Sequence, residues 1–189
     1  MKAGNDLGKS AGFTLIEVLI TFLVLAIGLL GLAGLQVNTL GNQFETYQRA
    51  QAVLLAEDLA NRIRVDAIAA RAGDYADNDQ YGLLADADCS VIAASAARYL
   101  CEWNKSLAGA SVEASGQKLG SMIGARGCIA NLAGSSDGEA VIRVTIAWQG
   151  STPTIAPASG CGVDQYGDDD RLRRTVSVDV VLANLALAP

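Results

Sequence analysis

One carboxylate stands inside a long apolar segment near the start of the chain. This segment opens with Gly12-Phe13-Thr14-Leu15-Ile16-Glu17 and remains apolar to Leu35. An ionised group in hydrocarbon costs about 2.5–3.5 kcal/mol even on lenient scales, so such a residue usually has a partner. The sequence holds no Lys, Arg or His between Gly12 and Phe44. The positive partner of Glu17 therefore comes either from another chain or from the amine that a cut between Gly12 and Phe13 would create.

Other segments match catalytic or metal-binding sequence motifs, but each lacks residues that the corresponding mechanism requires. Residues 134–138 have the letters of a nucleophile elbow, but that mechanism requires a His base and the chain has no His. Residues 115–118 match S-x-x-K without its partner motifs. The acidic segment 77–88 matches part of a calcium loop, yet Tyr81 stands where an oxygen ligand is needed and no closing Glu follows. We therefore expect no enzyme activity, no cofactor and no bound metal.

The charge distribution argues against a nucleic-acid partner. The net charge is −6, whereas nucleic-acid binding requires a basic footprint. Arg171, Arg173 and Arg174 form the only tight basic cluster, and three aspartates at 168–170 precede it directly. We expect this segment to be a self-neutralising surface loop.

Four cysteines, all downstream of the apolar segment, predict two disulfides. Cys89, Cys101, Cys128 and Cys161 include no CxxC pair, and the chain lacks His, so zinc and thioredoxin-like sites are disfavoured. An even count after a membrane segment suits oxidation outside the cytoplasm. Three pairings are open, and we favour Cys89–Cys101 with Cys128–Cys161 because these loops are the least nested.

The elements that position Glu17 begin with a membrane-length helix. Residues 18–35 are apolar apart from Thr21 and glycines, which is about the length needed to cross a bilayer. Lys2 and Lys9 precede this segment and no charge follows it until Glu45. Positive charge is retained on the cytoplasmic side, so the C-terminal part should face outward.

The helix should continue beyond the membrane to about residue 70. Leu55, Leu59, Ile63 and Ala67 step by four along one face, and Gly73 is a plausible C-terminal cap. The spacing of three glycines at 28, 31 and 34 has two open readings: a close-packing face for a neighbouring helix, or a soft point where the helix bends.

Two segments alternate between apolar and polar residues, as half-buried antiparallel strands do. They are residues 141–149 and 175–183, and a short extra helix is expected between Ile92 and Lys105. Trp103 and Trp148 are expected in the core rather than in a ligand site. The predicted architecture is α+β, a long N-terminal helix whose outer half packs on a small antiparallel sheet. Its parts are a leader (1–12), a transmembrane helix (13–37), an amphipathic helical half (38–72) and an extracytoplasmic β-rich domain (73–189).

The segment GFTLIEVLITFLVLAIGLLGLAGLQ, residues 12–36, resembles the class III signal and N-terminal helix of type IV pilins and pseudopilins. Further along, residues 52–64, Cys101-x-Trp103, Gly127-Cys128-Ile129 and residues 144–150 are similar to PilV-type minor pilins. The likeness is tight over residues 12–36 and loose over most of the remaining chain.

This resemblance implies a set of roles. A prepilin peptidase would cut after Gly12 and methylate the amine of Phe13, and Glu17 would be the acidic residue that docks one subunit on the next. The protein would stay in the inner membrane, held by lipid around residues 18–35, with its C-terminus in the periplasm. It would then join other minor pilins, the major pilin and the inner-membrane assembly platform to prime and cap a type IV pilus, which serves twitching motility and adhesion.

Three other functions remain open, and one of them is a simple membrane-anchored domain, for which replacing Glu17 by valine should change nothing. A minor pseudopilin of a type II secretion system would have the same N-terminal signal and helix. The neighbouring genes would distinguish a pilin from a pseudopilin. A secreted enzyme or binding protein, cut by ordinary signal peptidase near Gly31-Leu32-Ala33, predicts a mature N-terminus at Gly34.

Overall fold

The computed structural model describes residues 12–75, 78–83, 88–109, 113–114, 117–118, 122–132 and 139–183. The chain divides into two compact units, Met1–Gln43 and Phe44–Pro189. Of the predicted leader (1–12), residues 1–11 lie outside the described residues.

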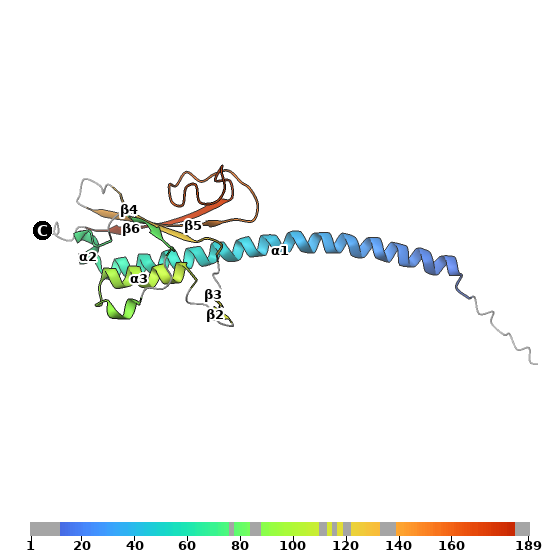
Figure 1. Ribbon diagram of the computed structural model, residues 1–189. Helices are drawn as coiled ribbons and strands as arrows, with labels where there is room; N and C mark the ends of the chain where they lie inside the picture. Colours follow the sequence, from blue (N-terminus) through green and yellow to red (C-terminus); the bar gives the residue numbers. More distant parts are fainter. Residues whose placement is uncertain are drawn as a thin grey trace, which may run out of the picture. The chain divides into compact units, whose positions relative to one another are not determined.

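Helix α1 (Leu15–Val65) enters from the first unit and continues into the second (Figure 1). Its N-terminal part is exposed along its whole apolar surface, and among the described residues it is the one helix long and apolar enough to cross a membrane. Two hydroxyls in this part turn back onto the helix: Thr21 Oγ1 donates to Val18 O at 2.7 Å and Thr39 Oγ1 to Leu35 O at 2.9 Å. Such bonds satisfy polar groups that hydrocarbon cannot solvate.

The C-terminal part of α1 buries the face that the sequence predicted. Leu59 and Ile63 are fully buried, and Leu55 and Ala67 are half-buried against the same core. Three small residues on the neighbouring positions are also fully buried, namely Ala52, Ala56 and Ala60. Since alanine lets the backbone approach closely, this face packs tightly on the rest of the unit.

The helix does not run unbroken to residue 70, as the sequence analysis expected. It ends at Val65, Asp66 leaves helical geometry at φ −101° and ψ 45°, and a short helix α2 (Ala67–Ala72) follows. Asp66 is tied into the second unit, because its carboxylate accepts a hydrogen bond from the Tyr75 hydroxyl at 3.2 Å. The expected cap is confirmed: Gly73 has φ 90°, and its N–H donates to the last turn of α2.

A four-stranded antiparallel sheet completes the core. Its order is β1-β4-β5-β6, with β1 at Asn78–Tyr81, β4 at Arg126–Leu132, β5 at Ala140–Gln149 and β6 at Arg173–Leu182. A separate two-stranded ladder joins β2 (Glu113–Ala114) to β3 (Gln117–Lys118). The strands predicted over 141–149 and 175–183 are confirmed as β5 and β6, and the α+β architecture with them.

The extra helix is confirmed as α3 (Ala96–Leu107), preceded by a 3-10 turn, η1 (Cys89–Val91). Figure 1 shows α3 lying beside the C-terminal part of α1. Trp103 of α3 is fully buried and donates its Nε1–H to Leu55 O of α1 at 2.8 Å, while Trp148 of β5 is 2% exposed. Both tryptophans are therefore core residues, as expected.

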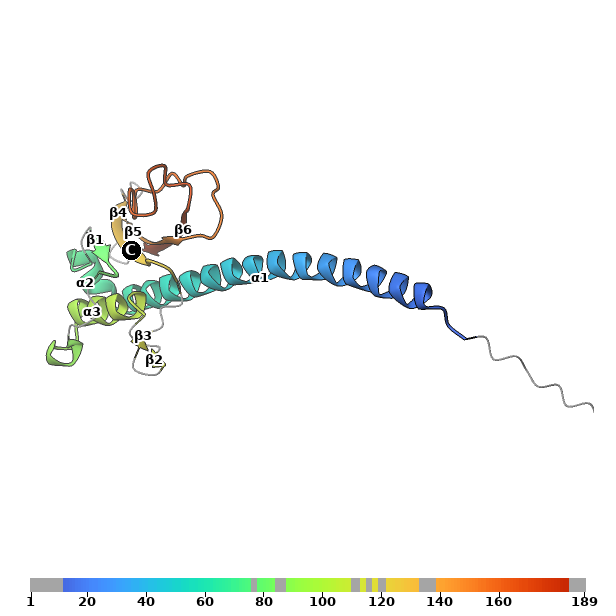
Figure 2. The same ribbon diagram turned by 45° about the vertical axis from the view of Figure 1, so that its right-hand side comes forward.

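Strand β5 is buried on both faces, which the alternating pattern did not predict. Ile142, Val144 and Ile146 face the helices, but Thr145 and Ala147, on the opposite face, are only 5% and 0% exposed. The β5–β6 connection covers them, on the far side of the sheet from α1 (Figure 2). A loop from elsewhere in the chain thus supplies the cover, so the strand's own sequence could not reveal it.

The basic cluster is not the surface loop that the sequence suggested. Only Arg171 matches that description, since it lies 3.9 Å from Asp169 and both side chains are exposed. Arg173 is 3% exposed and lies 3.3 Å from Asp170, while Arg174 crosses to α1 and pairs with Glu45 at 2.6 Å. Two of the three guanidinium groups are thus structural parts of the fold.

Candidate functional site

The candidate site at the start of α1 comprises Gly12, Phe13 and Glu17. Gly12 and Phe13 are exposed and precede the first helical residue, Leu15, so the bond between them is not enclosed by other described residues. A peptide bond in this position is accessible to an enzyme, because no folded element needs to open first.

Glu17 occupies the first turn of α1, where Thr14 caps the helix. The Glu17 N–H donates to Thr14 O at 3.1 Å and lies 3.4 Å from Thr14 Oγ1. The T-x-x-E pattern is the sequence signature of a capping box, and a carboxylate in the first turn is favoured by the helix dipole. Sequence reasoning missed this helix-starting role of Thr14, although the four-residue signal was present.

The Glu17 carboxylate forms no ion pair within the described part of the chain. Its neighbours on the helix are apolar and exposed, including Phe13 at 83% and Leu15 at 78%. Capping explains where α1 begins, but it leaves the charge unpaired in an apolar surface. The arrangement suits pairing with a positive group from outside this folded chain.

The glycines of the apolar segment pack against no side chain among the described residues. A methyl group built at Gly28, Gly31 or Gly34 would meet nothing within 4 Å. The described structure therefore gives no internal reason for glycine at these positions, and both readings of the spacing stay open.

Two disulfides fasten the second unit, in the pairing that the sequence analysis favoured. Cys89–Cys101 joins η1 to α3, and Cys128–Cys161 joins β4 to the β5–β6 connection. The second disulfide packs with Ala147 and Tyr166 on the outer face of the sheet, where burial raises the pKa of the Tyr166 hydroxyl to about 12.

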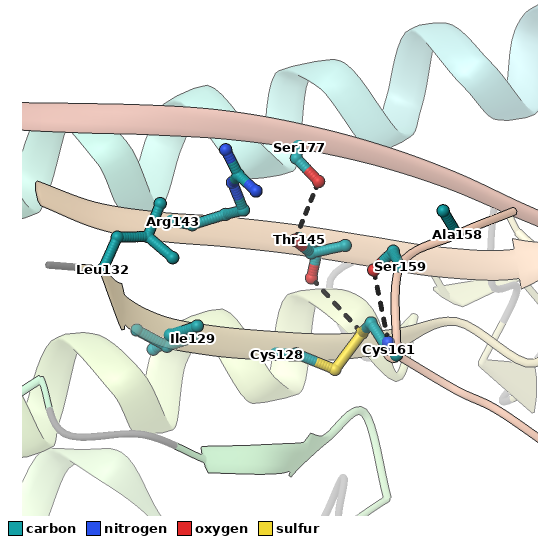
Figure 3. A pocket seen from close by; sticks show the side chains of 11 residues that line it. Cys128, Ile129, Leu132, Arg143, Thr145, Ala158, Ser159, Cys161 and Ser177 are labelled. Atoms are coloured by element: carbon teal, nitrogen blue, oxygen red, sulfur yellow. Dashed lines mark hydrogen bonds between the residues drawn. A yellow bond between two sulfur atoms is a disulfide. The ribbon is translucent and has the colours of Figure 1, made fainter.

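A shallow cavity of about 740 Å³ lies beside the Cys128–Cys161 disulfide (Figure 3). Its polar side chains already bind one another. Arg143 makes a two-pronged contact with Asp179 at 2.7 and 2.8 Å, and the hydroxyls of Thr145 and Ser177 lie 2.8 Å apart. The guanidinium of Arg143 is thus engaged by Asp179, and the hydroxyls of Thr145 and Ser177 are engaged by each other.

A charged network joins α3 to α1. Glu102 accepts hydrogen bonds from Arg62 at 2.7 Å and from Arg98 at 3.0 Å, and Arg62 also binds Asp58 at 3.0 Å. The two guanidinium groups, Arg62 first, hold the pKa of Glu102 below its usual value. These pairs help to fix the position of α3 on α1.

Several positions weighed in the sequence fall outside the described residues, including Ser115 and residues 134–138. Within the partly described calcium-like segment, Asp88 uses its carboxylate to cap η1, accepting from Ser90 N at 3.0 Å and from Ser90 Oγ at 2.6 Å.

Comparison with known families finds one match, at the candidate site. Residues 7–33 match the family model described as the prokaryotic N-terminal methylation motif. No curated protein and no solved structure matches the chain. The motif spans the exposed Gly12–Phe13 bond, the Thr14 cap and Glu17, and it implies processing by a prepilin peptidase and assembly with other pilins. The chain therefore carries the class III signal of the type IV pilin and pseudopilin family.

Proposed function

We propose that this protein is a minor pilin of the PilV type, a structural subunit that primes assembly of a type IV pilus and caps it. The observation that carries the proposal is the N-terminal methylation motif at the head of a continuous helix that leads into a disulfide-bonded α+β unit. Such a chain needs no catalytic residues of its own, and we assign it no enzyme activity.

Processing would supply the partner that Glu17 lacks. Cleavage after Gly12 leaves residues 13–189 as the mature chain and creates an amine on Phe13, about one helical turn from Glu17. The peptidase then methylates this amine. Methylation retains the positive charge, so the amine can still pair with a carboxylate.

Pairing between subunits would set the register of assembly. The Glu17 carboxylate of one subunit binds the Phe13 amine of its neighbour within the apolar core of the fibre. A subunit displaced along the helix axis would leave both charges buried and unpaired, which costs about 3–5 kcal/mol. The charge pair thus rejects misaligned subunits, while apolar contacts supply the attraction.

The subunit would begin in the inner membrane, spanning it once with its C-terminus in the periplasm. The flanking charges support this orientation, because Lys2 and Lys9 precede the apolar segment. From there it would join other minor pilins, the major pilin and the assembly platform, and so contribute to twitching motility and adhesion.

The test compares Glu17→Gln with Glu57→Gln in cells that produce pili. Glutamine retains the ability to complete the Thr14 capping box, so Glu17→Gln removes the charge without removing the helix start. We expect normal membrane insertion and a fall of at least about tenfold in the sheared pilus fraction, since the amine would be left unpaired. Glu57 is half-exposed on the C-terminal part of α1, and its variant controls for loss of a carboxylate elsewhere.

N-terminal mass spectrometry of the sheared fraction supplies the second readout. We expect a chain that begins with methylated Phe13. A chain that begins at Gly34 would refute the proposal, because it would show cleavage by an ordinary signal peptidase. Unchanged incorporation of the Glu17→Gln protein would refute the role given to Glu17.

The same signal is compatible with a minor pseudopilin of a type II secretion system. Deletion of the gene separates the two. Loss of surface pili with normal protein secretion supports the pilin, whereas loss of secretion with normal pili supports the pseudopilin.

A further inference from the structure

Strand β6 forms one edge of the four-stranded sheet, because it pairs with β5 alone. The register between the two strands is regular over all ten residues of β6. It continues just before the strand, where the Gly150 N–H donates to Leu172 O at 2.8 Å. In an antiparallel pair, residues that bond to the neighbouring strand alternate with residues whose N–H and C=O point away from it. Since Leu172 bonds towards β5, the odd-numbered residues of β6 direct their backbone groups to the edge.

Both ends of this edge are covered, and the middle is open. At the start, the Arg173 N–H donates to Asp170 O at 3.0 Å. At the end, the Arg71 guanidinium donates to Leu182 O at 2.6 Å and to Ala183 O. Between them, four residues have backbone N–H and C=O groups without a hydrogen-bond partner among the described residues, namely Thr175, Ser177, Asp179 and Val181. We call residues 175–181 the open edge.

The open edge lacks the features by which edge strands usually avoid pairing with other chains. Such strands carry prolines, bulges or charges that oppose an added strand. Strand β6 contains no Pro, and its register shows no bulge. The one charged residue of the open edge, Asp179, is engaged by Arg143 of β5 at 2.7 and 2.8 Å. The open edge is therefore suited to receive a further strand.

The side chains of the open edge indicate the chemistry of such a strand. On the face towards α1, Val180 is fully buried, whereas Val176 and Val178 are only partly buried against the core. On the outer face, the Ser177 hydroxyl lies 2.8 Å from that of Thr145 (Figure 3). Because side chains directly opposite each other in neighbouring strands interact, the added strand needs apolar residues beside the two valines and polar residues beside Ser177.

We propose that the open edge of β6 binds an extended segment of a different protein chain as a fifth, antiparallel strand, with apolar and polar residues in alternation. The backbone groups of the open edge supply four donors and four acceptors for this strand. The open edge belongs to the Phe44–Pro189 unit alone, so the inference goes beyond the proposed pilus function.

The direction of β6 argues against a second copy of this chain as the added strand. Arg174 pairs with Glu45 at 2.6 Å and Arg71 binds Leu182 O, so β6 runs beside α1 in the same direction. An antiparallel pair of two β6 strands turns one copy end for end. The two chains would then leave the pair at opposite ends towards their apolar segments, which does not suit two chains anchored on the same side of one membrane. This choice of partner rests on membrane anchoring by the apolar segment.

The test adds a synthetic peptide, three Thr-Val repeats with a final threonine, to the full chain in detergent. One form carries N-methyl groups on its valines, and the matched control carries them on its threonines. In antiparallel pairing, the peptide residues that bond to β6 have their side chains on the outer face, beside Ser177. These are the threonines, so only the valine-methylated form should bind.

Hydrogen exchange of single amides, followed by nuclear magnetic resonance, supplies the readout. In the free protein, the four odd-numbered amides of the open edge should exchange faster than the even-numbered amides, which bond to β5. The valine-methylated peptide, at about ten times its dissociation constant, should slow the four odd-numbered amides about tenfold. The threonine-methylated peptide should slow none of them.

Two variants of Ser177 form a matched pair. Ser177→Pro removes the central N–H of the open edge but retains the bonds to β5, since Pro is tolerated where an edge N–H faces away from the sheet. Ser177→Ala loses the same hydroxyl and keeps the N–H. We expect Ser177→Pro to abolish the slowing and Ser177→Ala to retain it, with slow exchange of Val178 and Val180 as the evidence that both variants fold.

Three results would overturn the proposal. Equal slowing by the two peptides, or no slowing at about 1 mM peptide, would exclude strand addition. Protection of the four amides in the free protein that disappears on dilution would show that a second copy occupies the edge. Protection that dilution does not change would show that the edge is covered within the chain.

Discussion

Replacing Arg173 by methionine should destabilise the Phe44–Pro189 unit far more than the same change at Arg171. Arg173 is 3% exposed, and its guanidinium donates to three backbone carbonyls of the β5–β6 connection: Pro157 at 3.0 Å, Cys161 at 2.9 Å and Ser159. It also lies 3.3 Å from the carboxylate of Asp170, a residue only 9% exposed. Methionine fills much of the same volume but removes the donor from the three carbonyls, and it leaves the Asp170 carboxylate with the Asp164 N–H and no positive partner from residue 173.

The expected loss follows from the charge left behind. Breaking a buried pair by removing one partner costs about 3–5 kcal/mol, because an uncompensated charge remains. For a folded unit of this size, each kcal/mol lowers the midpoint of thermal unfolding by about 2–4 °C, so we expect a fall of about 6–20 °C. Arg171 is exposed and 3.9 Å from Asp169, and an exposed pair of this kind contributes at most about 1 kcal/mol.

The assay is thermal unfolding of the full chain in detergent, followed by near-ultraviolet circular dichroism with both disulfides intact. The near-ultraviolet signal reports the packing of Trp103 and Trp148, which are both buried in this unit. Equal midpoints for Arg173→Met and Arg171→Met would refute the reasoning, since they would show that Arg173 is no more structural than a surface residue. Arg173→Lys should recover only part of the loss, because one ammonium cannot match the planar, forked geometry of guanidinium.

Three further changes test the same unit. Gly127→Ala should cost about 1–3 kcal/mol through overpacking, because the added methyl would overlap the Trp103 ring and would lie 2.6 Å from Leu107 Cδ1. Gly160→Ala, in open space, should cost little, and equal losses in denaturation would contradict this. Replacing Cys128 and Cys161 together by serine should cost about 3–4 kcal/mol, about 1 kcal/mol more than removing the η1–α3 disulfide, because the closed loop is 33 residues rather than 12; a reversed order in urea denaturation would argue against the chain-entropy reasoning. Glu102 has a lowered pKa in the folded protein, so its stabilisation is present above the ordinary pKa of about 4.3 and is lost as the pH falls through the lower, folded value. Glu102→Gln should therefore be less stable than the unmodified protein at pH 7, by at most about 1 kcal/mol for so exposed a pair. This difference should shrink in urea denaturation as the pH falls through the folded-state pKa of Glu102, and a difference that persists once Glu102 is protonated would contradict the assignment.

The sequence by itself determined the elements that repeat at a fixed period. The four-residue step of Leu59 and Ile63 located the buried face of α1, and alternation located β5 and β6. These predictions succeed because a helix or strand assigns residues to faces by spacing alone. The membrane-length helix and the unusual position of Glu17 within it were predictable for a similar reason, because a long apolar segment is a property of consecutive residues.

Only the tertiary structure decided the features that depend on distant neighbours. Strand β4 was not predicted, because Gly127, Cys128 and Ala130 give no clear alternation; α3 and the Cys128–Cys161 disulfide bury the first two. The break at Asp66 accompanies a hydrogen bond from Tyr75, nine residues on.

The three arginines near residue 172 show the same limit most clearly. In the sequence, these arginines follow three aspartates that balance their charge, which suggested a surface loop. In the fold, Arg171 is exposed, Arg173 is buried among backbone carbonyls and Arg174 reaches α1. Charge is a property of the residue, whereas burial and pairing belong to the fold that brings a partner to it. The pairing proposed for Glu17 would extend this reasoning beyond one chain, because within the described residues its charge has no ion-pair partner.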